Sequence, residues 1–150
     1  MYHAIVRRKL RKVFDDLNQG RYEGVLQDLA PRFEHVFFGP HTLGGVRHTV
    51  QTYRLWFERL FRLFPNIHFE VKNILVQGWP WNTVAAVEWA DQLTTRDGQL
   101  QQNAGVHIIR LRWGRVFEIR IYHDTHKLAE ICQRQAANGL EEAVAAQIVD

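Results

Sequence analysis

The sequence predicts a single α+β domain in which N-terminal helices cover one face of a curved antiparallel sheet. Three observations predict this fold class. Apolar residues recur at helical spacing in the first part of the chain, four long extended segments with short turns follow residue 66, and no linker or repeat interrupts the 150 residues. We therefore expect one domain over residues 1–150, with 138–150 as a possible loose or helical tail.

The first part of the chain is expected to be mainly helical. A first helix is predicted over residues 2–18, and a short second helix over 22–29, closed by Pro31. A β-like segment, 33–38, and a glycine-containing loop come next. A third helix is then predicted over 46–64, because aromatic and aliphatic residues repeat there every three or four positions.

The second part is expected to form the sheet. Extended segments are predicted at 67–77, 82–95, 100–112 and 115–124. Asp97-Gly98 is a hairpin-turn signal, because such turns need the positive φ that glycine tolerates. Short turns between consecutive strands predict an antiparallel meander without helical crossovers. A final helix is predicted over 125–137.

Composition limits the classes of function. Nine Phe, five Trp and four Tyr provide large rings that build a core or line a pocket. The lone cysteine, Cys132, excludes an intramolecular disulfide, so we expect a cytoplasmic protein. No uncharged stretch reaches the ~18 residues of a membrane span, and no signal-like apolar run is present at the start, so no membrane partner is expected.

Basic residues cluster on the first predicted helix. The formal net charge is only +3, and much of the excess comes from Arg7, Arg8, Lys9, Arg11 and Lys12. Apolar residues between them recur at helical spacing, which favours the solvated face of an amphipathic helix over a nucleic-acid site. We therefore expect no nucleic-acid partner.

Side-chain alternation along the strands groups the candidate catalytic residues. Trp89 and Asp91 share one face of the second extended segment, and His107 lies in the apolar row of the third. Tyr122 and Asp124 share a face of the last. If the register brings these rows together, Asp91, His107 and Asp124 converge on one concavity. A carboxylate in apolar surroundings has a raised pKa and serves as a general acid or base near neutral pH.

Each of these residues has a structural alternative. Asp91 would pair with a nearby arginine, and His107 would be a hydrogen-bonded core histidine. Asp124 would cap the helix that begins after it, since Asp-Thr-His-Lys suits an N-cap. His35 and His41 flank a short aromatic segment, where either imidazole would face a cavity mouth or water.

Metal and cofactor motifs are not found. Only His123-Asp124-Thr125-His126 places two histidines close together, and no metal-binding spacing of His or Cys occurs. The sequence also lacks a glycine-rich nucleotide loop and a Gly-x-Ser-x-Gly motif. We expect neither a metal nor a cofactor.

Several segments resemble one known family. Gly44-Gly45 precedes the long helix, which ends at Phe64-Pro65-Asn66; "VEWADQLTT", "NAGVHIIRLRWGRVFEIRIYHD" and a closing helix follow. Over residues 5–136 this order resembles the SnoaL-like polyketide cyclase branch of the nuclear-transport-factor-2-like (NTF2-like) superfamily. The resemblance implies a cone-shaped half-barrel with a pocket between sheet and helices, and a homodimer packed through the outer sheet face.

The resemblance also implies roles for individual residues. Asp124 matches the acidic residue that acts as acid and base in the cyclases, and His107 matches their assisting histidine. The chain departs from the ketosteroid isomerases, because His35-Val36 stands where they carry Asp-Pro. The Asp-Arg-Asp set of the limonene epoxide hydrolases is not identified either.

The leading hypothesis is therefore a cofactor-independent cyclase or isomerase that acts on an apolar carbonyl compound. Asp124 would move a proton on carbon, while His107 and Tyr122 would orient the substrate or stabilise an enolate oxygen. The substrate-binding residues are predicted to be Tyr122, Trp89, Trp56, Phe37, His35 and Tyr53. The alternative is a non-catalytic ligand-binding or dimerisation module. It is favoured if Asp91 and Asp124 are both tied up by arginine or by helix N–H groups.

Overall fold

Six strands and four α-helices follow one another in a computed structural model that describes residues 1–150. The helices are α1 (Tyr2–Leu17), α2 (Glu23–Gln27), α3 (Val50–Leu63) and α4 (Thr125–Ala137), with a 3-10 turn, η1 (Glu141–Val144), near the end. The strands are β1 (Leu29–Phe37), β2 (Gly45–Arg47), β3 (His68–Trp79), β4 (Asn82–Thr94), β5 (Leu100–Arg112) and β6 (Arg115–His123). The predicted α+β class is confirmed.

The sheet is mixed, with the strand order β2-β1-β6-β5-β4-β3. Strands β3 to β6 form the predicted antiparallel meander. β1, whose partner the sequence did not predict, pairs with β6 in parallel, so the sheet as a whole is mixed. The reason is topological: α3 carries the chain from β2 to the far edge of the sheet, and the meander then returns to β1 with β6 pointing the same way.

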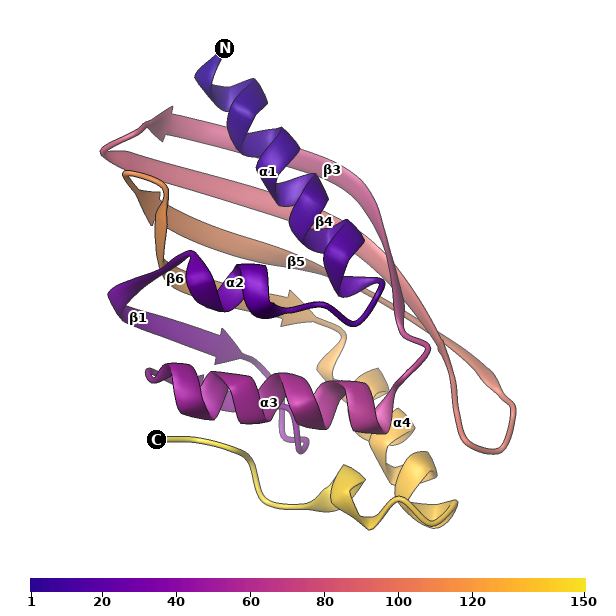
Figure 1. Cartoon of the computed structure of the whole chain (residues 1–150). Helices are drawn as coiled ribbons and strands as arrows, with labels where there is room; N and C mark the ends of the chain where they lie inside the picture. The colour runs from indigo at the N-terminus through magenta and orange to yellow at the C-terminus, as the bar shows by residue number, and fades with distance from the viewer.

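The helices α1, α2 and α3 lie over one face of the curved, open sheet, and α4 lies at the end where β6 finishes (Figure 1). α1 faces the sheet with Val6, Leu10, Phe14 and Leu17, which recur every three or four residues and are buried. Its end is fixed by Asn18, whose side-chain amide donates to Phe69 O at 2.9 Å and whose Oδ1 accepts from Phe69 N at 2.7 Å. None of the helices has the length and apolar character that crossing a bilayer requires.

Two predicted boundaries were wrong around residues 28–50. The second helix ends at Gln27 because Leu29 already pairs with Val116 in the sheet. Pro31, which lacks an N–H, lies in the irregular part of that pairing and does not end a helix. The third helix begins at Val50 rather than at residue 46, since the segment before it pairs with β1 as β2.

The last thirteen residues pack along α3. Asp150 accepts hydrogen bonds from the backbone N–H groups of His48 (2.9 Å) and Thr49 (2.9 Å), next to the start of α3. Arg59 donates to Ala146 O at 2.7 Å. The tail thereby covers one side of the helix that forms part of the cavity wall.

Candidate functional site

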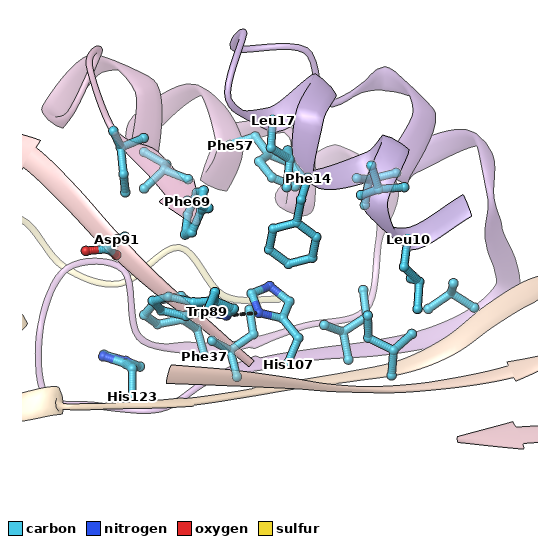
Figure 2. Close-up of a pocket in the computed structure, with 18 of the residues that line it drawn as sticks. Leu10, Phe14, Leu17, Phe37, Phe57, Phe69, Trp89, Asp91, His107 and His123 are labelled. Atoms are coloured by element: carbon cyan, nitrogen blue, oxygen red, sulfur yellow. Dashed lines mark hydrogen bonds between the residues drawn. The ribbon is translucent and has the colours of Figure 1, made fainter. Parts of the chain in front are cut away.

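A cavity of about 260 Å³ lies between the helices and the inner face of the sheet. Figure 2 shows its wall: Leu10, Phe14 and Leu17 come down from α1, Phe57 from α3, and Trp89 and His107 rise from the sheet. Nearly all of the lining is apolar. Such a volume is close to the lower end of small-molecule sites, roughly 300–1,000 Å³, and its lining suits a compact apolar ligand.

His107 is held in one protonation state by its neighbour in the sheet. Trp89 Nε1 donates to His107 Nδ1 at 2.7 Å, the dashed line in Figure 2. Because Nδ1 accepts this bond, the ring proton of the neutral imidazole must be on Nε2. Burial lowers the pKa of His107 to about 3, with His123 adding repulsion, so the ring stays neutral. Its Nε2–H has no partner within the protein and is a donor on the cavity side.

Asp91 is the acidic group at the other end of the cavity. Its Oδ1 is buried and has no hydrogen-bond partner. Burial raises the pKa of Asp91 to about 6, although a backbone N–H of Asn103 and the charge of Lys127 lower it. A carboxyl group with this pKa exchanges its proton close to neutral pH, as a general acid or base must.

Asp91 and His107 lie in one cavity but not in contact. Asp91 pairs with Asn103, four residues along β5 from His107, and the strand rise of ~3.3 Å per residue places the two positions ~13 Å apart along the sheet. Trp89 lies between them (Figure 2). A ligand that touches both groups must therefore extend across the Trp89 ring.

Asp124 and Tyr122 do not line the cavity. Asp124 is exposed and caps α4, with its Oδ1 accepting from Lys127 N at 3.0 Å. Tyr122 is 43% exposed and stacks on Phe38 on the outer side of the sheet. The physical reason is the alternation of side chains along β6. Ile119 and Ile121 are buried on the inner face of the sheet, so Tyr122, next to Ile121, points to the outer face.

The remaining predicted residues divide into two groups. Phe37, Tyr53 and Trp56 do line the cavity, and Trp56 is fixed by donating from Nε1 to Leu43 O at 2.7 Å. His35 is fully buried outside the lining, where its Nδ1 accepts from Arg47 Nε at 2.9 Å. Burial, helped by the Arg47 charge, lowers the pKa of His35 well below 6.5.

Several lining residues were not predicted as site residues. Phe14 packs edge-on against His107, with ring centroids 5.1 Å apart, and Phe69 packs against Trp89. The helical spacing of α1 identified Phe14 as apolar but not as part of a site. Asn103 and His123 also line the cavity. Asn103 Nδ2 bonds to Asp124 O at 3.2 Å, and His123 Nε2 bonds to Phe38 O at 2.7 Å, whereas His123 Nδ1 is buried and has no partner. His41 is buried and lies outside this cavity, in the wall of a second hollow formed with residues 143–147.

No three His, Cys, Asp or Glu side chains are grouped as metal ligands. Cys132 is buried, and burial raises the pKa of its thiol to about 12, so it stays protonated. The titratable groups that line the cavity and have unused hydrogen-bonding capacity include Asp91, His107 and His123, because Asp91 Oδ1, the Nε2–H of His107 and His123 Nδ1 lack a partner.

Comparison with known proteins agrees with this architecture. The SnoaL-like domain family matches residues 10–119. A search of curated proteins found no match. Similar solved structures include an NTF2-like protein of unknown function from Burkholderia pseudomallei (18% identity, TM-score 0.71, covering 83% of this chain and 95% of that chain).

Two further structures have similar folds. A putative SnoaL-like polyketide cyclase from Jannaschia is 20% identical, with a TM-score of 0.60 over 78% of this chain and 83% of that chain. PrhC from Penicillium brasilianum is 18% identical, with a TM-score of 0.73 over 91% of this chain and 89% of that chain. At this level of identity these structures bear on the fold alone.

Proposed function

Because the chain belongs to the SnoaL-like domain family, whose model spans residues 10–119, we propose that its cavity binds a small apolar carbonyl compound and that Asp91 moves a proton on it. The observation that carries the proposal is the state of Asp91: a carboxyl group inside an apolar cavity, with one buried oxygen that has no partner. A structural carboxylate in such a place would be hydrogen-bonded or paired with a cation. This one has capacity left for a ligand.

The proposed reaction begins with Asp91 ionised. Its carboxylate removes a proton from carbon next to a carbonyl group, and the C–H electron pair moves into the enolate. The Nε2–H of His107 is the donor available to the negative oxygen. Protonated Asp91 then returns its proton to another carbon, or the enolate carbon attacks a second carbonyl group of the same molecule.

The separation of the two groups limits the substrate. Since Asp91 and His107 are ~13 Å apart along the sheet, a simple ketone does not reach both. A conjugated carbonyl compound does, because conjugation carries negative charge from the carbon at Asp91 to an oxygen several atoms away. We therefore expect flat, conjugated rings stacked beside Trp89 as ligands.

Hydrogen exchange at carbon tests the proposal. Conjugated cyclic ketones are incubated with the protein in deuterated water, and deuterium entering the carbon next to the carbonyl is measured by NMR. Asp91→Asn is expected to abolish the exchange while ligands still bind. Asp124→Asn is the matched control, because asparagine also caps a helix and the exchange should persist. Equal exchange by the Asp91→Asn variant would contradict the role of Asp91.

A second candidate function is binding without turnover. Asp124 is engaged as a helix cap, and no other base contacts Asp91 to relay its proton. If conjugated ketones quench the fluorescence of Trp89 but no deuterium enters them, the binding module is the better description.

We also propose that the protein works in the cytoplasm as a homodimer that packs through the outer sheet face. Val106 and Ile108 of β5 lie on that outer face, because they alternate along the strand with His107, which faces inward. Tyr122 of β6 lies opposite Val106. Partly exposed aliphatic and aromatic side chains on a sheet face are typical of such an interface. Ile108→Glu is expected to yield monomers in analytical ultracentrifugation, whereas Leu55→Glu, at an exposed position of α3 over the other sheet face, should leave the mass unchanged.

A further inference from the structure

Three exposed tryptophans gather at one end of the sheet. Trp79 and Trp81 flank the β3–β4 turn, and Trp113 lies in the β5–β6 turn; they are 60%, 56% and 71% exposed. Trp79 and Trp81 stack with centroids 6.2 Å apart, and Trp113 lies 6.3 Å from Trp81. We call these three residues the tryptophan rim. A contiguous exposed group of large apolar side chains marks an interaction surface.

The first turn of α1 extends this apolar surface. His3 Nε2 bonds to Gly78 O at 2.7 Å, and the Tyr2 hydroxyl bonds to Thr83, so the helix start is fixed beside the β3–β4 turn. Met1 and Ile5 are both exposed there. Figure 1 shows the start of α1 and the two turns at the same end of the molecule.

The same end of the molecule is strongly basic. The segments that form it, residues 1–14, 77–84 and 109–117, contain no Asp or Glu. They contribute basic side chains on α1 and on both sides of Trp113: Arg7, Arg8, Lys9, Arg11, Lys12, Arg110, Arg112 and Arg115. Two of these are paired, Lys12 with Asp16 at 2.8 Å and Arg110 with Glu118 at 3.3 Å. Asp28 also lies against this end, and it is paired with Lys9 at 3.3 Å. The surface therefore complements a negatively charged partner.

The cavity reaches the surface beside the tryptophan rim. Among the residues that line it, only Ile5 and Gly114 are exposed; the others are buried or half-buried. Gly114 follows Trp113 directly, and Lys9 Nζ bonds to its carbonyl oxygen at 3.3 Å. Whatever covers the rim thus lies against the opening of an apolar cavity.

We propose that the tryptophan rim docks on an anionic lipid bilayer, with the three indoles at the level of the headgroups and the basic side chains against the lipid phosphates. Tryptophan favours this interface because its ring is apolar and its N–H is polar, and basic side chains beside it are attracted to anionic lipids. The expectation of no membrane partner rested on the lack of a spanning segment, and surface docking needs none.

Two other partners fit the rim less well. Single-stranded nucleic acid is bound in grooves where aromatic rings alternate with basic residues. These indoles lie instead at two turns, where Trp79 and Trp81 stack on each other and Trp113 is tilted against Trp81. A second copy of the chain packed on this end about a two-fold axis would bring the two basic surfaces together, and like charges oppose such a contact.

Co-sedimentation with vesicles tests the proposal. Wild-type protein should sediment with vesicles of equal parts phosphatidylcholine and phosphatidylglycerol, less with phosphatidylcholine alone, and less at high salt. Trp81→Ser combined with Trp113→Asn should weaken vesicle binding at least about tenfold, because each indole contributes to binding by burying its apolar surface in the bilayer. Asparagine is chosen since residue 113 has a φ of 50°. Leu100→Ser is the control, a 61% exposed side chain at the opposite end of the sheet.

Charge variants test the basic half of the proposal. Arg8→Gln with Arg112→Gln should lower the affinity for the anionic vesicles by about 30-fold, from roughly 1 kcal/mol for each basic side chain at the surface. Arg96→Gln, in the turn between β4 and β5, should not. These measurements need no substrate, so their failure would leave the proposed proton transfer unaffected.

Three results would overturn the proposal. One is equal vesicle binding by the wild type and the tryptophan double variant. Another is binding of a single-stranded oligonucleotide together with no binding to anionic vesicles. The last is a wild-type protein that forms a concentration-dependent dimer, together with a tryptophan double variant that does not, when neither of the two sediments with vesicles.

Discussion

Replacing Asp91 by asparagine should make the protein more stable at neutral pH, and by an amount that grows with pH. Asp91 has a pKa of about 6 in the folded chain, raised by burial from an ordinary value of 3.8. The folded state therefore binds this proton more tightly than the unfolded state does. Stability is highest when the carboxyl group is protonated and falls as pH rises from about 4 to above 6.

The size of the effect follows from the pKa difference. A difference of roughly two units corresponds to about 3 kcal/mol at about 1.4 kcal/mol per unit. Because Asp91 is only partly shielded from water in the cavity, we expect about 1–3 kcal/mol. Asparagine stays neutral, so the variant does not lose this stability as the pH rises. The difference in unfolding free energy, variant minus wild type, should therefore increase by this amount between about pH 4 and pH 8.

Urea unfolding of both proteins across this pH range measures the difference. A constant offset from the amide group cancels when only the change with pH is considered. Glu88→Gln, on the outer face of the same strand, controls for the loss of one negative charge. A difference that stays flat, or that falls as pH rises, would refute the description of Asp91 as a desolvated and unpaired carboxyl group.

Three further substitutions probe the site and its support. Asp124→Ala should cost about 1 kcal/mol of unfolding free energy in urea titrations, whereas Asp124→Asn should cost only a few tenths, because only alanine removes the cap of α4. Phe14→Ala, which removes the ring against His107, should destabilise the fold by about 3–5 kcal/mol and enlarge the cavity, and a larger ligand should then bind better than in wild type. Gly105→Ala should cost about 1–3 kcal/mol and shift the Trp89 emission, because a Cβ would lie 2.8 Å from the Trp89 ring and 2.5 Å from Tyr122 O.

The fold was largely predictable because local patterns determine most of it. The β3–β6 meander has short turns, and alternation placed Trp89 and Asp91 on one face of β4 correctly. The parallel pairing of β1 with β6 was not predictable in the same way, since it joins residues far apart in the sequence and neither strand indicates its partner.

The site was predicted only in part, for a physical reason that β6 illustrates. Alternation separated Tyr122 from Ile121 but did not say which of the two faces the core. Ile119 and Ile121 indicate that their face is the inner one, because aliphatic side chains fill the interior. The prediction of a site on the other face rested instead on the resemblance of Asp124 to a catalytic position. The depth of burial of Asp91 depends on α1 and α4 as well as on its own strand, and no local pattern records that.

Two buried charged groups show why Asp91 calls for a functional explanation. Arg47 is completely buried, and burial lowers its pKa to about 10. Its guanidinium nevertheless donates to His35 Nδ1 at 2.9 Å and to backbone carbonyls, including Gly45 O at 3.0 Å and Gly44 O at 3.1 Å, so its hydrogen-bonding groups are used within the fold.

Asp91 is compensated only in part: a backbone N–H of Asn103 and the charge of Lys127 lower its pKa, but its Oδ1 lies without a partner in a cavity whose other free polar groups include the N–H of His107 and Nδ1 of His123. Holding it ionised there costs stability at neutral pH, and a leucine or asparagine at this position would remove the cost. Nothing in the packing around β4 requires a carboxyl group. A molecule that enters the cavity and exchanges a hydrogen bond or a proton with Asp91 supplies the reason that the fold itself does not.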